Sequence, residues 1–191
     1  MPRVQLVSRK TIYQGHVIRL VREVLKSNGR TFARETMQHP GAVVILPLLE
    51  ESRLVFVRQY RRAIGRCILE LPAGTLMPGE PRQRCAQREL EEETGWRATR
   101  WQRLGQFYAA PGFLSEQMTL FLAQGLIKTV ARPEPDEWLT PVILPLKTAV
   151  ANIRSGAICD AKSIIGVLVL REWRRARGLK RSRNWCRLIP S

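Results

Sequence analysis

The segment between Gly74 and Trp96 constrains the fold of this chain more than any other part of its sequence. It reads GTLMPGEPRQRCAQRELEEETGW and places five glutamates in the fourteen positions 80–93, although the whole chain has 32 Lys plus Arg against 16 Asp plus Glu. Prolines and glycines before residue 81 predict a loop, residues 81–94 have the composition of a helix, and Gly95 is suited to end it. The segment therefore predicts a loop, a helix and a turn.

Three of these glutamates share one face of the predicted helix. At ~100° per residue, Glu89, Glu92 and Glu93 fall within an arc of roughly 100°. Like charges at this spacing repel each other and destabilise a helix, so a cation is expected nearby. One interpretation is a hard divalent cation such as Mg²⁺, which prefers oxygen ligands. The other is a solvated acidic face that pairs with Arg84 and Arg88.

Apolar runs predict strands both before and after the acidic segment. The turn sequence KSNGR is expected to join two of the N-terminal strands, and the runs 42–49 and 53–60 are expected to form a second hairpin. The predicted strands cover residues 15–25, 31–38, 42–49, 53–60, 103–110, 117–126 and 140–146.

Two helices are predicted near the C-terminus, where apolar residues recur with helical spacing at 146–156 and 160–178. Loops are expected at 70–80, 111–116 and 131–138, where proline and glycine interrupt the pattern. Strands followed by a helix, further strands and further helices indicate an α+β protein or a helix-sheet-helix sandwich.

The composition is that of an ordinary globular domain, with 45% hydrophobic residues in 191. No apolar run reaches the ~20 residues of a membrane span, no signal-peptide pattern begins the chain, and its four cysteines show no zinc-binding spacing. A cytoplasmic protein without a membrane partner is expected. The net charge of +16 favours attraction to polyanions, or it serves solubility alone.

The full spacing over residues 74–96 is G-x5-E-x7-R-E-L-x-E-E-x-G-W. This pattern matches the Nudix box, so the chain resembles the Nudix hydrolases; Trp96 stands where a medium aliphatic residue is more common. The resemblance implies the Nudix fold, an α+β architecture in which a mixed β-sheet is sandwiched between helices (α/β/α), with an N-terminal antiparallel strand extension. It also implies hydrolysis of a nucleoside diphosphate linked to another group.

The resemblance implies a role for each matching residue. Mg²⁺, or alternatively Mn²⁺, would be held by Glu89 and Glu93, with Glu92 close to them and the carbonyl group of Ala73 completing the site. Arg88 would orient the glutamates, and Glu80 would brace the loop. The glycines at positions 74 and 95 would allow turns at the two ends.

Sequences that flank the box resemble the ADP-ribose pyrophosphatase branch of the family. They are RETMQHPGAVVILPL, VRQYR, ELPAG, PGFLSE and DAKSI. In that branch a proline beyond the box, here Pro111, is associated with ADP-ribose. The implied reaction is Mg²⁺-dependent hydrolysis of ADP-ribose to AMP and ribose 5-phosphate. Alternatives are a related nucleotide-sugar or dinucleotide pyrophosphatase acting on GDP-mannose or NADH, and an RNA-binding or RNA-processing Nudix protein.

By position in the branch, Arg34 and Arg61 are candidates to hold phosphate or the terminal ribose. Candidates for stacking on adenine are Tyr60, Tyr108 and Phe113. Alternatively, Tyr60 and Phe113 belong to the core, and Arg61 lies at a solvated strand end.

The general base of this branch lies on an acidic loop, which corresponds here to residues 131–138. Glu137 and Glu134 are the first candidates for this catalytic role, followed by Glu116, and Glu92 is a further catalytic candidate. Thr140 stands where the branch usually has an acidic residue, so the loop departs from the pattern.

Three parts of the chain are expected. Residues 1–40 form the strand extension, which in this branch mediates homodimerisation and contributes to the partner's substrate site. Residues 41–178 form the Nudix hydrolase domain, and residues 179–191 form a basic tail. The tail is expected to be solvated, and the alternative is that it contacts nucleic acid through its charges.

Overall fold

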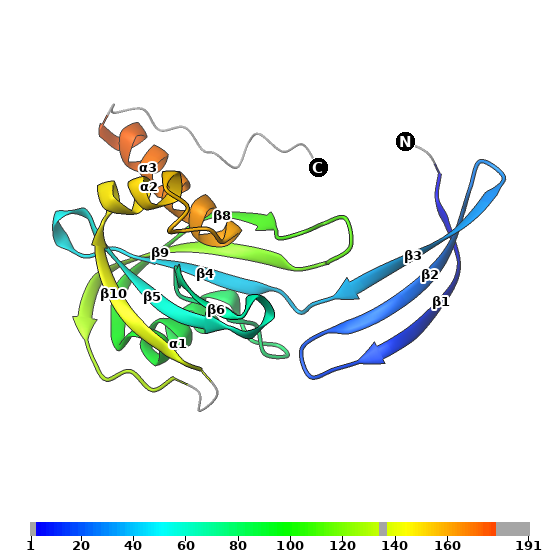
Figure 1. The fold of residues 1–191 in the computed structure, drawn as a ribbon, viewed down its shortest axis with the longest axis horizontal. Coiled ribbons are helices and arrows are strands. Elements are labelled where there is room, and N and C mark those ends of the chain that lie inside the picture. Colours follow the sequence, from blue (N-terminus) through cyan, green and yellow to red (C-terminus); the bar gives the residue numbers. More distant parts are fainter. Residues whose placement is uncertain (1–2, 134–136, 179–191) are drawn as a thin grey trace. The chain divides into compact units, whose positions relative to one another are not determined.

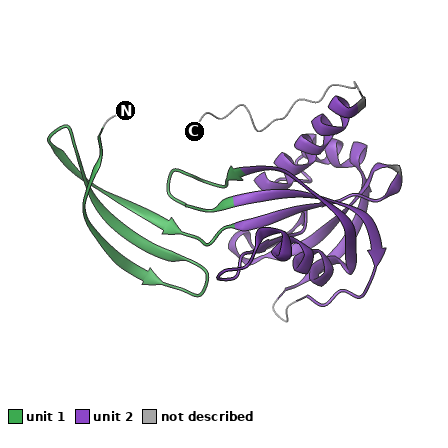
Figure 2. Cartoon of the chain, turned by 180° about the vertical axis from the view of Figure 1, so that it is seen from behind, with its two compact units in different colours: residues 1–41, 107–117 green, residues 42–106, 118–191 purple. Residues whose placement is uncertain are grey.

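The computed structural model describes residues 3–133 and 137–178 of the chain. The chain divides into two compact units, one formed by Met1–Gly41 with Phe107–Gln117 and the other by Ala42–Gln106 with Met118–Ser191 (Figure 2). Residues 107–117 fall within the predicted hydrolase domain, 41–178, but the structure groups them with the N-terminal strands. The proposed tail, 179–191, lies outside the described residues.

The first unit is built on a three-stranded antiparallel sheet with the order β1-β2-β3. Its strands are β1 (Gln5–Gln14), β2 (Arg19–Ser27) and β3 (Arg30–Gln38). Asn28 and Gly29 join β2 to β3 with φ angles of 48° and 75°. Positive φ at both positions is the conformation that a two-residue hairpin requires. The predicted N-terminal hairpin and its turn are therefore confirmed.

The segment 107–117 is attached to the end of β3 by main-chain hydrogen bonds. The amide of Met37 donates to the carbonyl oxygen of Phe113 over 2.7 Å, and the amide of Ser115 donates to that of Met37 over 2.9 Å. These bonds link two stretches that are distant in the sequence, which is why the segment belongs to the first unit.

The second unit contains two sheets, a four-stranded one in the order β7-β4-β9-β8 and a three-stranded one in the order β10-β5-β6. Strand β4 runs parallel to β9 and antiparallel to β7. The sheet is therefore mixed, as expected. The strands are β4 (Ala42–Pro47), β5 (Arg53–Arg61), β6 (Arg66–Glu70), β7 (Ala73–Thr75), β8 (Trp96–Tyr108), β9 (Gln117–Lys128) and β10 (Leu139–Pro145).

The expected hairpin between 42–49 and 53–60 is wrong. β4 and β5 belong to different sheets and share a single isolated bridge, Leu48 to Leu54. All six residues of β4 are buried, so this strand needs neighbours on both edges and cover on both faces. The short 3₁₀ helix Glu50–Ser52 separates it from β5. The predicted loop at 70–80 is also interrupted, because Ala73–Thr75 pairs with β4 as β7.

Helices cover both faces of the mixed sheet (Figure 1). The helices are α1 (Arg82–Thr94), α2 (Leu146–Arg154) and α3 (Ala161–Gly178). Leu90 of α1 packs in one cluster with Val43 and Ile45 of β4. A Cβ atom on Gly166 of α3 would lie 3.6 Å from Leu46, the next residue of β4. Because successive strand residues point to opposite faces, α1 and α3 lie on opposite sides of β4. This arrangement confirms the predicted helix-sheet-helix fold class.

Glycine ends α1 as predicted. Gly95 has φ of 65°, and its amide donates to the carbonyl oxygen of Glu91 over 2.9 Å. A Cβ atom at this position would lie 2.7 Å from the main-chain nitrogen of Ala131. Gly95 is therefore required both for its conformation and for its lack of a side chain.

No helix within residues 3–133 and 137–178 has the length and apolar content to cross a membrane.

Replacing Gly95 by alanine is expected to destabilise the protein more than the same change at Gly65. Gly65 has nearly the same φ, 66°, but no atom lies within 4 Å of the position that its Cβ atom would take. Gly65→Ala therefore carries only the conformational penalty of about 1 kcal/mol, whereas Gly95→Ala adds a clash with main chain worth at least ~1 kcal/mol more. Urea unfolding of both variants measures the difference, and equal losses of unfolding free energy would contradict the packing at Gly95.

Candidate active site

Two glutamates on α1 are buried against β7. Glu89 is 8% exposed and Glu93 is 1% exposed. A Cβ atom on Gly74 would lie 1.9 Å from the carboxylate carbon of Glu89, so this carboxylate occupies the space that a side chain at position 74 would need. Gly74 does not have a positive φ and lies in a strand. The expectation that Gly74 serves a turn is wrong, because it makes room for Glu89 instead.

Burial makes these two carboxylates difficult to ionise. It raises the pKa of Glu89 to about 7, with Arg88 opposing the shift and the charges of Glu92 and Glu137 adding to it. The pKa of Glu93 is raised well above its usual value, first by burial and then by the charges of Glu89 and Glu137. The amide of Ala73 donates to Oε2 of Glu93 over 3.3 Å, which only partly compensates.

Arg88 is the cation among the glutamates Glu80, Glu89, Glu92 and Glu93, which are called the acidic cluster below. Its guanidinium group lies 2.7 Å from Glu89, 3.0 Å from Glu92 and 3.1 Å from Glu80. Glu80 also accepts a hydrogen bond from the amide of Met77, so Arg88 ties the preceding loop to the helix. One guanidinium group thus faces three carboxylates, and the cluster keeps an excess of negative charge.

The donor set of this cluster consists of carboxylate oxygens, which suit a hard divalent cation. Within the described ranges, no three His, Cys, Asp or Glu side chains are already arranged around a common point for a metal ion. Instead, Arg88 forms ion pairs with Glu89 and Glu92. Arg84, the second arginine considered for an acidic surface, is exposed and forms no ion pair with a described side chain. The buried negative charge and the position of the Glu89 carboxylate against Gly74 favour a bound cation over a solvated acidic face.

Glu137 is the only one of the two leading base candidates within the described residues, because Glu134 lies outside them. Glu137 is partly buried, and its negative charge raises the pKa of both Glu89 and Glu93. The neighbouring Trp138 fixes the position of Glu137. The carbonyl oxygen of Trp138 accepts a hydrogen bond of 3.1 Å from the amide of Tyr60, and the ring centroids of Trp138 and Tyr60 lie 5.9 Å apart. The structure therefore brings Glu137 to the glutamates of α1.

Glu116, the third base candidate, lies in the first unit. Its carboxylate is 3.8 Å from Nδ1 of His39, and its carbonyl oxygen accepts a hydrogen bond from the amide of Ala109. The hydroxyl group of Ser115 accepts a bond of 3.0 Å from the amide of His39. Within its own unit, Glu116 thus helps to hold the loop 109–116 onto the end of β3.

Arg61 forms a bidentate ion pair with Glu70, with distances of 2.7 and 2.8 Å. Glu70 is 1% exposed and also binds Lys162, which pairs with Asp160 over 2.9 Å. Burial alone would raise the pKa of Glu70, but Arg61 and Lys162 lower it overall. The pKa of Arg61 is raised, mainly by Glu70 and in part by the charge of Glu93. Arg61 is therefore anchored within electrostatic reach of the acidic cluster, and is not a free strand end.

The other predicted substrate residues lie in the first unit, except Tyr60. Arg34 is exposed on β3, where its guanidinium group lies 4.8 Å from the ring centroid of Phe32. Pro111 is exposed, and Phe113 and Tyr108 are 56% and 55% exposed. Phe113 is therefore not a core residue of the chain.

Sequence reasoning missed two residues of this region. Trp138 is 68% exposed beside Glu137 and offers an aromatic surface. Its signal in the sequence is an aromatic residue directly after the acidic loop. Glu70 anchors Arg61, and its signal is a charged residue that follows the apolar run CIL just before the box.

A cavity of about 600 Å³ borders the outer side of α1. Four arginines line it together with the carboxylates of Glu91 and Glu92, and two of these arginines pair with the carboxylates. Its lining includes Arg84, Arg88, Glu92, Arg97, Trp101 and Arg132.

Comparison with known proteins identifies the family of the chain. The family model of the NUDIX domain matches residues 37–161. A protein named methanol dehydrogenase activator, from Bacillus methanolicus, is 38% identical over 167 residues, which cover 86% of this chain and 90% of that protein. The ADP-ribose pyrophosphatase of Bacillus subtilis is 35% identical over 167 residues, with the same coverage of 86% and 90%.

Among solved structures, the crystal structure of an ADP compounds hydrolase superposes with a TM-score of 0.81. It is 24% identical in sequence, and the match covers 94% of this chain and 97% of that one. This likeness confirms the fold.

The chain belongs to the Nudix family and is a Nudix hydrolase. Enzymes of this family generally use divalent metal ions and act on small nucleoside diphosphate compounds.

Without divalent cations, the free energy of unfolding is expected to fall as the pH rises from 4.5 to about 7, the interval between the ordinary pKa of Glu89 and its raised value in the fold. A carboxyl group whose pKa is higher in the folded state stabilises the fold below this interval and loses that contribution across it. Glu89→Gln cannot ionise, so it should be more stable than the wild type at pH 8 by on the order of 3 kcal/mol.

Urea unfolding in EDTA at pH 4.5 and pH 8 measures this difference. Glu91→Gln is the matched control, because Glu91 lies on the solvent side of the same helix, pairs with Arg97 and has a lowered pKa. It should gain no stability at pH 8. If Glu89→Gln showed the same pH dependence as the wild type, the burial of an ionisable carboxyl group at this position would be contradicted.

Proposed function

We propose that this Nudix hydrolase is a Mg²⁺-dependent ADP-ribose pyrophosphatase. It adds water across the diphosphate bond of ADP-ribose and releases AMP and ribose 5-phosphate. The observation that carries the proposal is the buried carboxylate cluster of α1 within the Nudix box, in a chain whose Bacillus subtilis relative has this activity in its name.

Glu89, Glu92 and Glu93 hold the metal ion, together with the carbonyl oxygen of Ala73. When bound, Mg²⁺ or Mn²⁺ supplies positive charge to the phosphate oxygens and makes water a better nucleophile. The chain contributes the buried, repelling carboxylates that favour a cation, and the space beside Gly74 in which Glu89 lies. Arg88 holds the carboxylates on one side of the helix.

Glu137 is the proposed general base. A base must lie near the water that it deprotonates, and Glu137 is near enough to Glu89 and Glu93 to raise their pKa values. Tyr60 fixes the neighbouring Trp138 and with it the start of β10. Glu134 and Glu116 remain alternatives for this role, and Glu92 is proposed to act chiefly through the metal.

Substrate binding is assigned to five residues by their positions in the family. Arg61 contributes a guanidinium group that Glu70 holds in place, and Arg34 contributes one on β3. Both suit phosphate or ribose oxygens. Tyr60 and Phe113 offer aromatic surfaces for adenine, with Pro111 shaping the loop that carries Phe113.

We also propose a homodimer formed through the N-terminal extension. Every residue of β1 is exposed, including Leu6 at 47%, Ile12 at 50% and Tyr13 at 58%. An uncovered edge strand with apolar side chains is suited to pairing with a partner strand or surface. Contact of the basic tail with nucleic acid remains the alternative use of residues 179–191.

Turnover of ADP-ribose is expected to require Mg²⁺ or Mn²⁺ and to fall roughly 10³-fold in Glu93→Gln, since the loss of a metal ligand removes several kcal/mol of transition-state stabilisation. Glu137→Gln should lower kcat by ~10²–10⁴-fold without changing the metal requirement. Glu91→Gln, on the same helix, should keep near-normal activity. Near-normal turnover of Glu93→Gln at saturating Mg²⁺ would show that the metal assignment is wrong.

In a substrate panel, ADP-ribose should have the highest kcat/KM, by about tenfold over GDP-mannose, NADH, diadenosine polyphosphates and 8-oxo-dGTP. Product identification by chromatography should give AMP and ribose 5-phosphate in equal amounts. If GDP-mannose or NADH came first, the related pyrophosphatase activity would replace the one proposed here, and cleavage of capped RNA alone would indicate an RNA-processing enzyme.

Light scattering should give a molar mass near twice the 21.9 kDa of one chain. Replacing Leu6 and Ile12 together by lysine should shift the mass toward the monomer, because charges replace the exposed apolar side chains. The matched control adds two lysines to the same strand at the polar positions Ser8 and Thr11. A monomeric wild-type protein at micromolar concentration would contradict the dimer.

A further inference from the structure

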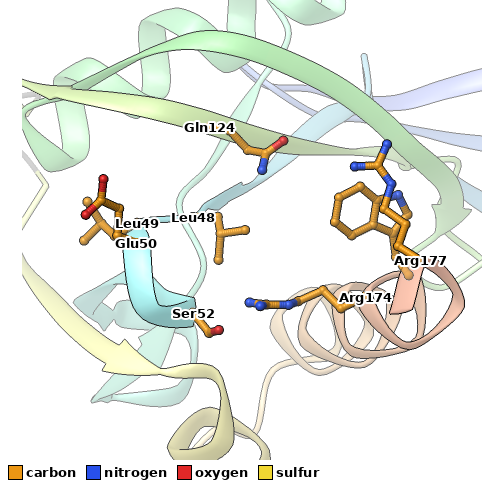
Figure 3. Close-up of a pocket in the computed structure, with 8 residues that line it drawn as sticks. Leu48, Leu49, Glu50, Ser52, Gln124, Arg174 and Arg177 are labelled. Atoms are coloured by element: carbon orange, nitrogen blue, oxygen red, sulfur yellow. The ribbon is translucent and has the colours of Figure 1, made fainter. Parts of the chain in front are cut away.

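A cavity of about 550 Å³ lies in the second unit, between the short 3₁₀ helix Glu50–Ser52 and the last turns of α3. Figure 3 shows the side chains of Leu48, Gln124 and Arg174 directed toward the same space, with Arg177 at its edge. The volume lies within the ~300–1,000 Å³ that is usual for small-molecule sites. This cavity is separate from the acidic cluster, because α1 and α3 lie on opposite sides of β4.

The arginines of α3 divide into two groups. Arg171 and Arg175 both pair with Glu172, at 3.0 and 3.4 Å. Arg174 and Arg177 line the cavity and form no ion pair with any described carboxylate. Three residues apart, they lie on the same side of the helix. The cavity is therefore bordered by two guanidinium groups that no described carboxylate neutralises.

Glu50 is the one acidic residue among the described side chains that line the cavity. It makes no ion pair with Arg174 or Arg177 among the described side chains, and Figure 3 shows it beside Leu49, on the side away from them. Among the described side chains, two guanidinium groups and one carboxylate on the other side of the cavity leave the arginine side positive. Ser52, whose hydroxyl group also lines the cavity, adds a hydrogen-bonding group.

An aromatic surface accompanies the positive charge. Cζ of Arg177 lies 4.3 Å from the ring centroid of Trp173, so the guanidinium group is stacked over the indole. Trp173 also lines the cavity. Guanidinium groups bind phosphate with a planar fork, and aromatic and guanidinium planes stack on nucleobases. One cavity thus combines the two kinds of group that recognise a nucleotide.

We propose that this cavity is a second, non-catalytic site that binds a nucleoside phosphate. Arg174 and Arg177 contact the phosphate group, and the base packs against the surface that Trp173 and Arg177 form. Its size suits a mononucleotide, and it requires neither the metal ion nor the carboxylates of α1.

The test uses the full chain in EDTA with AMP as the probe. Binding is followed by calorimetry and by the NMR signal of the Trp173 indole N–H, which is assigned by its absence from Trp173→Phe. AMP is expected to shift this signal and to bind at least tenfold more tightly than adenosine or inorganic phosphate. No shift of the Trp173 signal at saturating AMP would overturn the proposal, whatever the result of the substrate panel.

Charge-matched variants separate a site from general attraction. Replacing Arg174 and Arg177 together by glutamine should weaken AMP binding at this signal at least tenfold. It should leave the initial rate of ADP-ribose turnover, measured with no added AMP, unchanged. Replacing Arg171 and Arg175 by glutamine removes the same charge from the same helix and should alter affinity less than twofold. Equal weakening by both pairs, or binding of a single-stranded oligoribonucleotide through these arginines without binding of AMP, would refute a nucleotide site.

Discussion

Repulsion between buried carboxylates is the interaction that the structure around α1 has to offset. Glu89 and Glu93 are buried on one face of α1, and Glu92 and Glu137 add negative charge beside them. An isolated helix with this pattern would be destabilised. The fold keeps it by ion pairing through Arg88, by an amide hydrogen bond from Ala73 and by packing Cys85, Ala86 and Leu90, which share the buried face of α1, into the core.

The packing of α1 explains why β4 is the centre of the second unit. Val43 and Ile45 of β4 contact α1, while Leu46 faces α3, so this strand connects the two helical layers. Next to it, β7 carries Ala73 and Gly74 to the carboxylates. Glycine at position 74 lets the helix approach so closely that the Glu89 carboxylate lies where a Cβ atom would be. The geometry of the acidic cluster thus follows from strand pairing as much as from the helix itself.

The basic residues of the second unit are used in different ways. Arg88 on α1 and Arg61 at the end of β5 are paired with carboxylates, which fixes the positions of both partners. Near the end of α3, Arg174 and Arg177 have no described carboxylate partner and border a cavity. The arginines behind the net charge of +16 therefore have two roles. Some order the acidic cluster, and others offer positive charge to anions.

The local elements and the residue types of the box follow from the amino-acid sequence alone. The spacing of Glu89, Glu92 and Glu93, the end of α1 at Gly95 and the turn at Asn28 follow from backbone conformation and helical periodicity, which are local properties. The pairing of β4 with β9, the separation of β5 into another sheet, and the association of residues 107–117 with the N-terminal strands are contacts between distant segments. Apolar composition does not specify which buried strands are neighbours, so these contacts are defined only in the folded chain. The same holds for the ion pair of Arg61 with Glu70 and for the approach of Glu137, because each depends on the register in which separate strands meet.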